Sequence, residues 1–162
     1  MKLPLMNLES LEITLRAEIP EHYRDSMGHM NVMWYTYLFS NAFGKFAQSF
    51  GFDEAYMRAH HAGSFALETH TRYLAEVKIG NHITVRTRLL GRTPKRIHFM
   101  HFMTIDGTGA LAATQEHIGA HIDMRVRRMA PFPDEILARY DAILAEHNKL
   151  PWEAPLCGSM KP

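Results

Sequence analysis

The chain has 162 residues and a mass of 18.6 kDa, which is enough for one domain with a hydrophobic core and too little for two ordinary domains. Its 18 Lys and Arg nearly balance 17 Asp and Glu, so the overall charge gives no indication of a nucleic-acid partner. A composition of 46% hydrophobic and 22% charged residues excludes a disordered chain. The 11 histidines are unusual and leave metal binding and proton transfer open.

Cysteine use and the start of the chain indicate the compartment. Cys157 is the single cysteine, so no internal disulfide can form, and Pro4 and Asn7 interrupt the short apolar run that a signal peptide would need. Residues 26–44 lack Asp, Glu, Lys and Arg, but their polar side chains argue against a membrane helix. We therefore expect a cytoplasmic protein with no membrane partner.

The first predicted elements are a strand, a long helix and a short helix or turn. Residues 11–18 alternate apolar and polar side chains, which is typical of a half-exposed strand. Residues 32–50 are apolar except for a narrow stripe, which predicts a helix buried on nearly every side. Gly51 would end this helix, and residues 53–60 form the short helix or turn.

Four strands and a second long helix follow. A period of two predicts strands at residues 65–77, 82–90, 96–105 and 111–123, and the turn sequences between them favour an antiparallel meander. Pro133 begins a helix whose apolar face contains Ile136, Leu137, Tyr140, Ile143, Leu144 and His147.

This order of elements predicts an α+β fold. A curved antiparallel sheet of about five strands, wrapped around the long helix, would bury that helix without a second helical layer. The second long helix would lie on the surface. We expect a single domain over residues 1–162, with a core at about residues 8–148 and a loose tail at residues 150–162.

The segment before the long helix carries a recognisable motif. Residues 25–31 resemble the Asp-x-x-Gly-His-x-Asn signature of hotdog-fold acyl-CoA thioesterases, in their 4-hydroxybenzoyl-CoA thioesterase-like branch. Residues 68–76 and 95–98 are similar to the thioesterase-type domain fused to some carnitine dehydrogenases. The chain departs from the pattern at Tyr23, where many relatives have a second acid, and at Val32, where they have a second Asn.

The resemblance implies an enzyme that hydrolyses an acyl-CoA to free acid and CoA without a metal or redox cofactor. Asp25 would be the nucleophile or the general base, although an Asp in this position is also a common turn or capping residue. The backbone N–H of Val32 would hold the oxyanion at the positive end of the helix dipole. Glu68 is a candidate partner or alternative base, provided that its strand passes the helix start.

Other residues would position the substrate. Gly28 allows a tight turn, and His29 could orient the substrate or the Asp25 carboxylate. Asn31 could hydrogen-bond Asp25 or the thioester, but it is also a common N-cap. The candidates for the acyl pocket are Tyr35, Phe39 and His70. The weaker candidates for the CoA phosphates are Arg86, Arg88, Lys95 and Arg96.

The histidine spacing does not indicate a metal site. His98 and His101 lie three residues apart on a predicted strand and so face opposite sides. His117 and His121 share a face but would be about 13 Å apart at the rise of a strand, too far to chelate one ion. We therefore expect no metal.

Two other functions remain open. A hotdog hydratase or dehydratase would use the same helix to polarise a thioester, but its usual His-led motif is not evident. A non-catalytic acyl-CoA-binding or scaffold protein is the second alternative, and the departures at Tyr23 and Val32 keep it open. In every case the open edges of the sheet and the resemblance imply a homodimer or homotetramer, with the site between subunits.

Overall fold

The computed structural model describes residues 6–162. Two short 3-10 helices, Leu8–Ser10 and Glu21–Tyr23, flank the first strand. The other elements, in chain order, are β1 (Ile13–Glu18), α1 (Val32–Ser49), α2 (Glu54–His60), β2 (Ala62–Tyr73), β3 (His82–Arg92), β4 (Arg96–Ile105), β5 (Leu111–Asp123), β6 (Arg128–Met129) and α3 (Asp134–His147).

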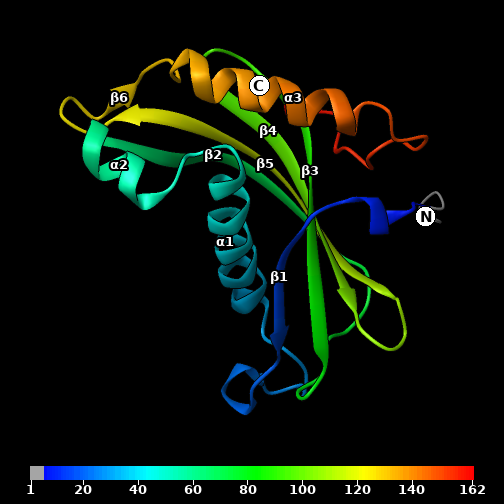
Figure 1. Cartoon of the computed structure of the whole chain (residues 1–162). Coiled ribbons are helices and arrows are strands. Elements are labelled where there is room, and N and C mark those ends of the chain that lie inside the picture. Colours follow the sequence, from blue (N-terminus) through cyan, green and yellow to red (C-terminus); the bar gives the residue numbers. More distant parts are fainter. Residues whose placement is uncertain (1–5) are drawn as a thin grey trace.

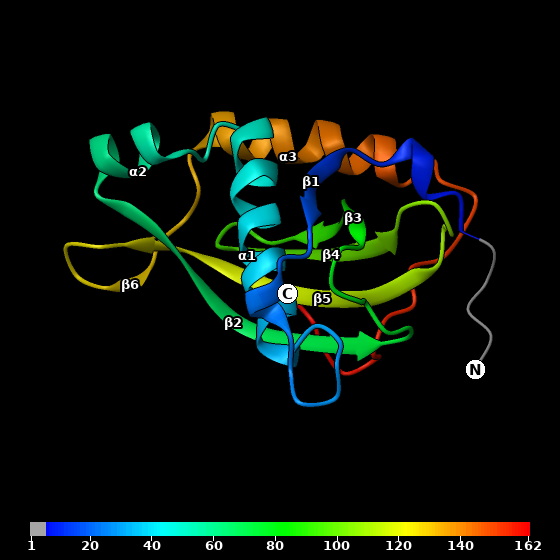
Figure 2. The same cartoon turned by 90° about the horizontal axis from the view of Figure 1, so that it is seen from below.

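The strands form one antiparallel sheet in the order β1-β3-β4-β5-β2, and the two-residue β6 pairs with β5. The sheet curls around α1, which lies against its concave face (Figures 1 and 2). This arrangement confirms the predicted hotdog fold. The bounds of β4 and β5 are those expected from the period of two, because both strands end at clear turn sequences.

The predicted meander is wrong for β2. This strand pairs with β5, from Ala62 opposite Asp123 to Tyr73 opposite Ala113, and not with β3, which follows it in sequence. The chain therefore leaves one edge of the sheet after Tyr73 and returns beside β1 at His82. Residues 74–81, the crossover segment, make this connection. A period of two shows which faces of a strand are apolar but not which strand is its neighbour.

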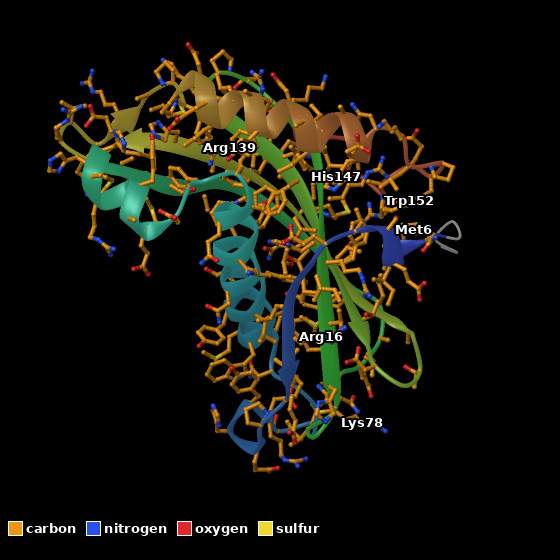
Figure 3. The ribbon with its side chains drawn as sticks, viewed as in Figure 1. Met6, Arg16, Lys78, Arg139, His147 and Trp152 are labelled. Carbon is orange, nitrogen blue, oxygen red and sulfur yellow. The ribbon has the colours of Figure 1, made fainter. Side chains whose placement is uncertain are left out.

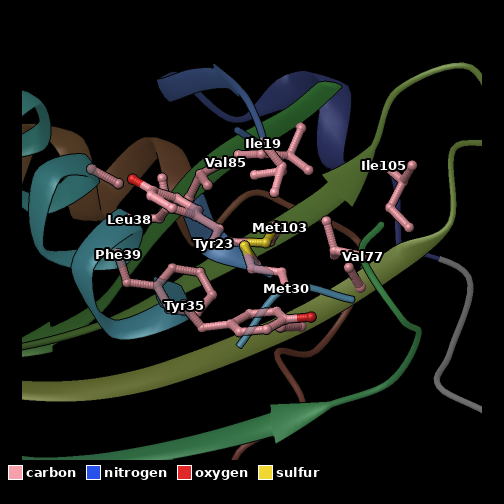
Figure 4. Packing of buried hydrophobic residues seen from close by; sticks show 14 residues of the cluster. Ile19, Tyr23, Met30, Tyr35, Leu38, Phe39, Val77, Val85, Met103 and Ile105 are labelled. Carbon is pink, nitrogen blue, oxygen red and sulfur yellow. The ribbon is translucent and has the colours of Figure 1, made fainter. Parts of the chain in front are cut away.

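Only one face of α1 is buried in the single chain. That face packs on the sheet through Tyr35, Leu38, Phe39, Ala42, Phe46 and Ala47. Near the helix start, the buried face of α1 packs in a hydrophobic cluster that includes Val85 and Met103 (Figure 4). On the opposite face Met33 and Tyr37 are 61% and 51% exposed, so the expectation of nearly complete burial is wrong for one protomer. None of the helices in residues 6–162 has the length and apolar content needed to cross a bilayer.

The second long helix, α3, presents the apolar face that the sequence predicts. Ile136 and Tyr140 are buried in one cluster with Phe46 and Phe50 at the end of α1. His147 accepts a hydrogen bond at Nδ1 from the backbone N–H of Leu89 in β3, 2.9 Å away. These contacts fix α3 across the strands at one end of the sheet (Figure 1).

The C-terminal segment is packed rather than loose. Trp152 and Met160 are buried, and Trp152 belongs to a cluster with Met100 and Phe102 of β4. The Arg88 guanidinium donates to the carbonyl oxygens of Trp152 and His147, at 2.6 and 3.1 Å. It also lies 4.4 Å from the centroid of the Trp152 ring. Figure 3 labels Trp152 in the segment that follows α3. The expectation of a loose tail is therefore wrong. The sequence shows few apolar residues in this segment, but it does not show that the buried Arg88 binds the segment to the sheet.

Replacing Arg88 by Met should remove both hydrogen bonds and leave the Trp152 carbonyl without a partner in residues 6–162, while the His147 carbonyl keeps the N–H of Leu150 at 3.4 Å. We expect the free energy of unfolding to fall by about 2 to 4 kcal/mol, measured by urea denaturation. Arg72→Met is the matched control, because Arg72 donates one exposed hydrogen bond to Leu156 of the same segment. This control variant should lower the free energy of unfolding by less than about 1 kcal/mol. Equal losses in the two variants would contradict a special role for Arg88.

Candidate functional site

A tight turn precedes α1 and brings Asp25 next to His29. The backbone N–H of Asp25 donates to the carbonyl of His29 at 2.9 Å, and the N–H of Gly28 donates to the carbonyl of Asp25 at 3.2 Å. Gly28 has a φ of +91°, a conformation that side chains disfavour. The glycine of the motif is therefore required by the turn itself.

The Asp25 carboxylate is held in a fixed orientation. Its Oδ1 accepts hydrogen bonds from the backbone N–H groups of Met27 and His29, at 2.8 and 3.3 Å. Its Oδ2 lies 3.2 Å from Nδ1 of the His29 ring. Desolvation acts to raise the pKa of Asp25, but these N–H donors and the His29 ring outweigh it and lower that pKa. The carboxylate is consequently ionised at neutral pH.

The start of α1 offers a free backbone N–H. Asn31 is the N-cap: its side chain accepts from the N–H of Met33, and its carbonyl accepts from the N–H of Trp34, both at 3.0 Å. Among residues 6–162, the N–H of Val32 has no protein acceptor. This N–H stands at the positive end of the helix dipole and can bind a developing negative charge. Asn31 thus caps the helix, and no hydrogen bond among residues 6–162 joins it to Asp25.

The crossover segment closes the site from the other side. The N–H of Met30 donates to the carbonyl of Val77 at 2.8 Å, and His29 forms a backbone bridge with Lys78. These bonds place Glu76 beside the turn, with its Oε1 4.0 Å from His29 Nε2. Residues from two distant parts of the sequence therefore share one site.

Between the turn and the crossover segment lies a cavity of about 410 Å³. Its walls are Asp25, His29, Met30, Val32, Tyr35 and residues 73–76. The rings of Tyr35 and Tyr73 meet nearly at right angles, 80° between planes, with centroids 5.0 Å apart. Sequence reasoning placed Asp25, His29, Val32 and Tyr35 at the site but missed residues 73–76. The resemblance over residues 68–76 was the available signal, but the expected strand through Val77 did not predict a cavity wall.

Three other predicted residues lie away from this cavity. Phe39 is fully buried and stacks on His101, with ring centroids 5.5 Å apart, beside a separate cavity of about 230 Å³. Glu68 is exposed on the edge strand β2. His70 pairs with Glu116 of β5 and therefore lies on the convex face of the sheet. The structure does not bring Glu68 or His70 to Asp25.

The basic candidates for the CoA phosphates also lie outside the cavity walls. Arg88 is 7% exposed and its guanidinium binds the C-terminal segment, so its assignment to a phosphate is corrected. Arg86 lies on the same face of β3 as Arg88. The Nε of Arg86 is buried without a hydrogen-bond partner in residues 6–162. Lys95 and Arg96 stand where β3 turns into β4. These three stay predictions.

One group of side chains in the described part of the chain could offer three metal ligands. Donor atoms of His70, Glu116 and Cys157 lie within 4.8 Å of one another on the convex face. The Glu116 carboxylate is already bonded, to His98 Nε2 at 2.8 Å and to the N–H of Cys157 at 2.7 Å. No spacing pattern in the sequence predicts this group, because only the packing of the C-terminal segment brings Cys157 to the sheet.

Comparisons with known proteins agree with the fold. Residues 20–140 match the model of the Thioesterase-like superfamily. The chain is 36% identical over 138 residues to the betainyl-CoA thioesterase of Pseudomonas aeruginosa, covering 85% of this chain and 87% of that protein. It is 35% identical over 132 residues to an L-carnitine dehydrogenase/betainyl-CoA thioesterase of Agrobacterium fabrum, covering 82% of this chain and 27% of that protein.

Solved structures show the same fold. A Staphylococcus aureus protein in complex with CoA superposes with a TM-score of 0.83 at 24% identity, covering 94% of this chain and 96% of that one. The DHNA-CoA thioesterase of S. aureus superposes with a TM-score of 0.76 at 18% identity, covering 83% of this chain and 91% of that one.

Burial of His101 should make the protein sensitive to acid. Burial, assisted by the neighbouring His117, lowers the pKa of His101 from 6.5 to about 3. The unfolded chain therefore binds a proton that the folded chain excludes, and the free energy of unfolding falls as the pH drops from about 6.5 towards 3. His101→Asn should flatten this fall by up to about 1.4 kcal/mol per pH unit, measured by urea denaturation between about pH 7.5 and 5. An unchanged slope would contradict the assignment.

Proposed function

This chain belongs to the Thioesterase-like superfamily and is an acyl-CoA thioesterase, and on that premise we propose that Asp25 and the start of α1 carry out the hydrolysis. The observation that supports this assignment is the shared cavity, which an ionised carboxylate and a free helical N–H both line. The relatives favour hydrolysis over the hydratase and the non-catalytic alternatives.

The thioester carbonyl would bind with its oxygen at the N–H of Val32. As the tetrahedral intermediate forms, negative charge develops on that oxygen, and the helix dipole stabilises it. One such donor is typically worth about 3 to 4 kcal/mol of transition-state stabilisation. A backbone donor serves equally well from Val as from Asn, so the departure at position 32 does not remove this function.

Asp25 would act on the carbonyl carbon, either as the nucleophile or as the base that deprotonates water. Its fixed Oδ1 leaves Oδ2 beside His29 as the oxygen available for reaction. Hydrolysis transfers no electrons, so the proposed reaction needs no redox cofactor. The carboxylate takes the role that a metal-bound hydroxide has in other hydrolases. Treatment with EDTA should therefore leave the rate unchanged.

The substrate proposed is a CoA thioester of a short cationic acid. The relatives from P. aeruginosa and A. fabrum carry betainyl-CoA thioesterase in their names. A cavity of about 410 Å³ is large enough for a small acyl group with several methyls.

We propose that the active form is a homodimer or a larger homo-oligomer. Met33 and Tyr37 are exposed on one face of α1, and Leu67 is 46% exposed on β2. β2 is an edge strand with free backbone groups, and such an edge next to an apolar face favours pairing with another copy. A partner here would cover α1 and complete the burial that its sequence predicts.

Asp25→Asn should lower kcat for thiol release from betainyl-CoA by about 100-fold or more, because the amide cannot accept the proton or attack the carbonyl. Asp53→Asn is the matched control: Asp53 accepts a comparable turn hydrogen bond, from the N–H of Tyr56 at 2.8 Å, at the start of α2. Release of CoA is followed with a thiol reagent, and the control should keep nearly full activity. An active Asp25→Asn enzyme would remove Asp25 from the mechanism.

Leu67→Arg should convert the oligomer into monomers, since it places a charge at the proposed contact. Light scattering after size-exclusion chromatography measures the mass. Val126→Arg makes the same change at a position that is 63% exposed, on the turn before β6, and should keep the oligomer. A wild-type monomer would contradict the proposal.

A further inference from the structure

One part of the cavity wall combines a pair of tyrosine rings, called the aromatic corner below, with a carboxylate. Tyr35 projects from α1 and Tyr73 ends β2, and their rings meet edge to face with centroids 5.0 Å apart. Glu76 follows three residues after Tyr73 on the same wall. Tyr35 is 5% exposed, whereas Tyr73 is 51% exposed, so most of the accessible aromatic surface belongs to Tyr73.

We propose that Tyr73, Tyr35 and Glu76 form the subsite that recognises a quaternary ammonium on the acyl group. This inference rests on the proposed thioesterase function and assigns its substrate specificity to particular side chains. Nothing in the names of the relatives assigns these residues.

The charge of the cavity favours a cation. Asp25 and Glu76 both line it, and of the described residues in its walls none is Lys or Arg. Arg24, next to Asp25 in sequence, is engaged with Glu21 through two hydrogen bonds. Lys78 contributes a backbone bridge to His29 and is exposed. An acyl group with a carboxylate would meet two like charges and be rejected.

The aromatic corner suits a cation that cannot donate hydrogen bonds. A trimethylammonium group is bulky, carries its charge over its methyls, and binds to the faces of aromatic rings. Desolvation raises the pKa of both Tyr35 and Tyr73, so both rings remain neutral phenols at physiological pH. The charges of Glu76 and Asp25 add to the rise at Tyr35, which places that ring in the field of both carboxylates.

A pair of substrates with the same shape tests the inference on the unmodified enzyme. Betainyl-CoA has a trimethylammonium group where 3,3-dimethylbutyryl-CoA has a neutral tert-butyl group. Each kcat/KM is divided by the rate constant for uncatalysed hydrolysis of the same thioester, because the ammonium withdraws electrons from the carbonyl and makes it more reactive. On this scale we expect kcat/KM to be about 10- to 100-fold higher for betainyl-CoA, from the ring contacts together with a partly screened carboxylate. The preference should decrease as salt is added, because Glu76 stands at an exposed position.

Variants then separate the contributions. Tyr73→Leu should lower kcat/KM for betainyl-CoA by about 5- to 10-fold and leave the neutral isostere within about twofold. Tyr73→Phe keeps the ring and should retain the preference. Glu76→Gln should lower kcat/KM for betainyl-CoA by about 3- to 5-fold and leave kcat/KM for the neutral isostere unchanged. Glu135→Gln, a change of the same type at an exposed position in the first turn of α3 and outside the cavity walls, is the control and should change neither kcat/KM.

Equal kcat/KM values for the two substrates in the wild-type enzyme, each divided by its uncatalysed rate constant, would overturn the subsite while leaving the thioesterase function intact. If Tyr73→Leu lowered kcat/KM equally for both substrates, the ring would contribute to the shape of the cavity but not to recognition of the cation. This result too would overturn the proposed subsite. If no acyl-CoA released thiol, the proposed function and the subsite would both fail. The circular dichroism spectrum of each variant confirms that it is folded.

Discussion

The hydrogen bond between Met30 N–H and Val77 carbonyl, 2.8 Å long, joins the turn before α1 to the crossover segment between β2 and β3. Because β2 and β3 belong to different regions of the sheet, the chain must cross from one to the other, and it passes the start of α1 on the way. The crossing brings Tyr73 and Glu76 opposite Asp25. This bond and the backbone bridge between His29 and Lys78 hold the two walls of the cavity together.

The two ends of the cavity have opposite electrostatic character. The free N–H of Val32 provides partial positive charge for the thioester oxygen, while Asp25 and Glu76 make the rest of the wall negative. An oxyanion donor is worth about 3 to 4 kcal/mol, whereas a cation–π contact is worth about 0.5 to 2 kcal/mol, depending on its burial. In the proposed mechanism the turn before α1 would therefore set the rate, and the aromatic wall would adjust which acyl group is used.

The convex face of the sheet is occupied by structural contacts. Arg88 holds the carbonyls of Trp152 and His147, and Glu116 holds the N–H of Cys157. Both buried charged groups bind backbone atoms of the C-terminal segment, which helps to hold that segment over the sheet. A cation that looked available for phosphate in the sequence is thus committed to the fold. The separation also keeps this stabilising network distant from the catalytic cavity, so the two can vary independently.

The sequence by itself determined the local elements and the chemistry of the turn. Alternating side chains define β4 and β5, and the motif at residues 25–31 contains the carboxylate, the φ-positive Gly28 and the N-cap Asn31 in one continuous segment. Local hydrogen bonds within a few residues suffice to arrange such a segment. Only the tertiary structure decided that β2 pairs with β5, that Glu68 and His70 lie away from Asp25, and that Tyr73 and Glu76 lie beside it. Those relations depend on strand order and on the path of the crossover segment, which are set by long-range packing that side-chain periodicity does not encode.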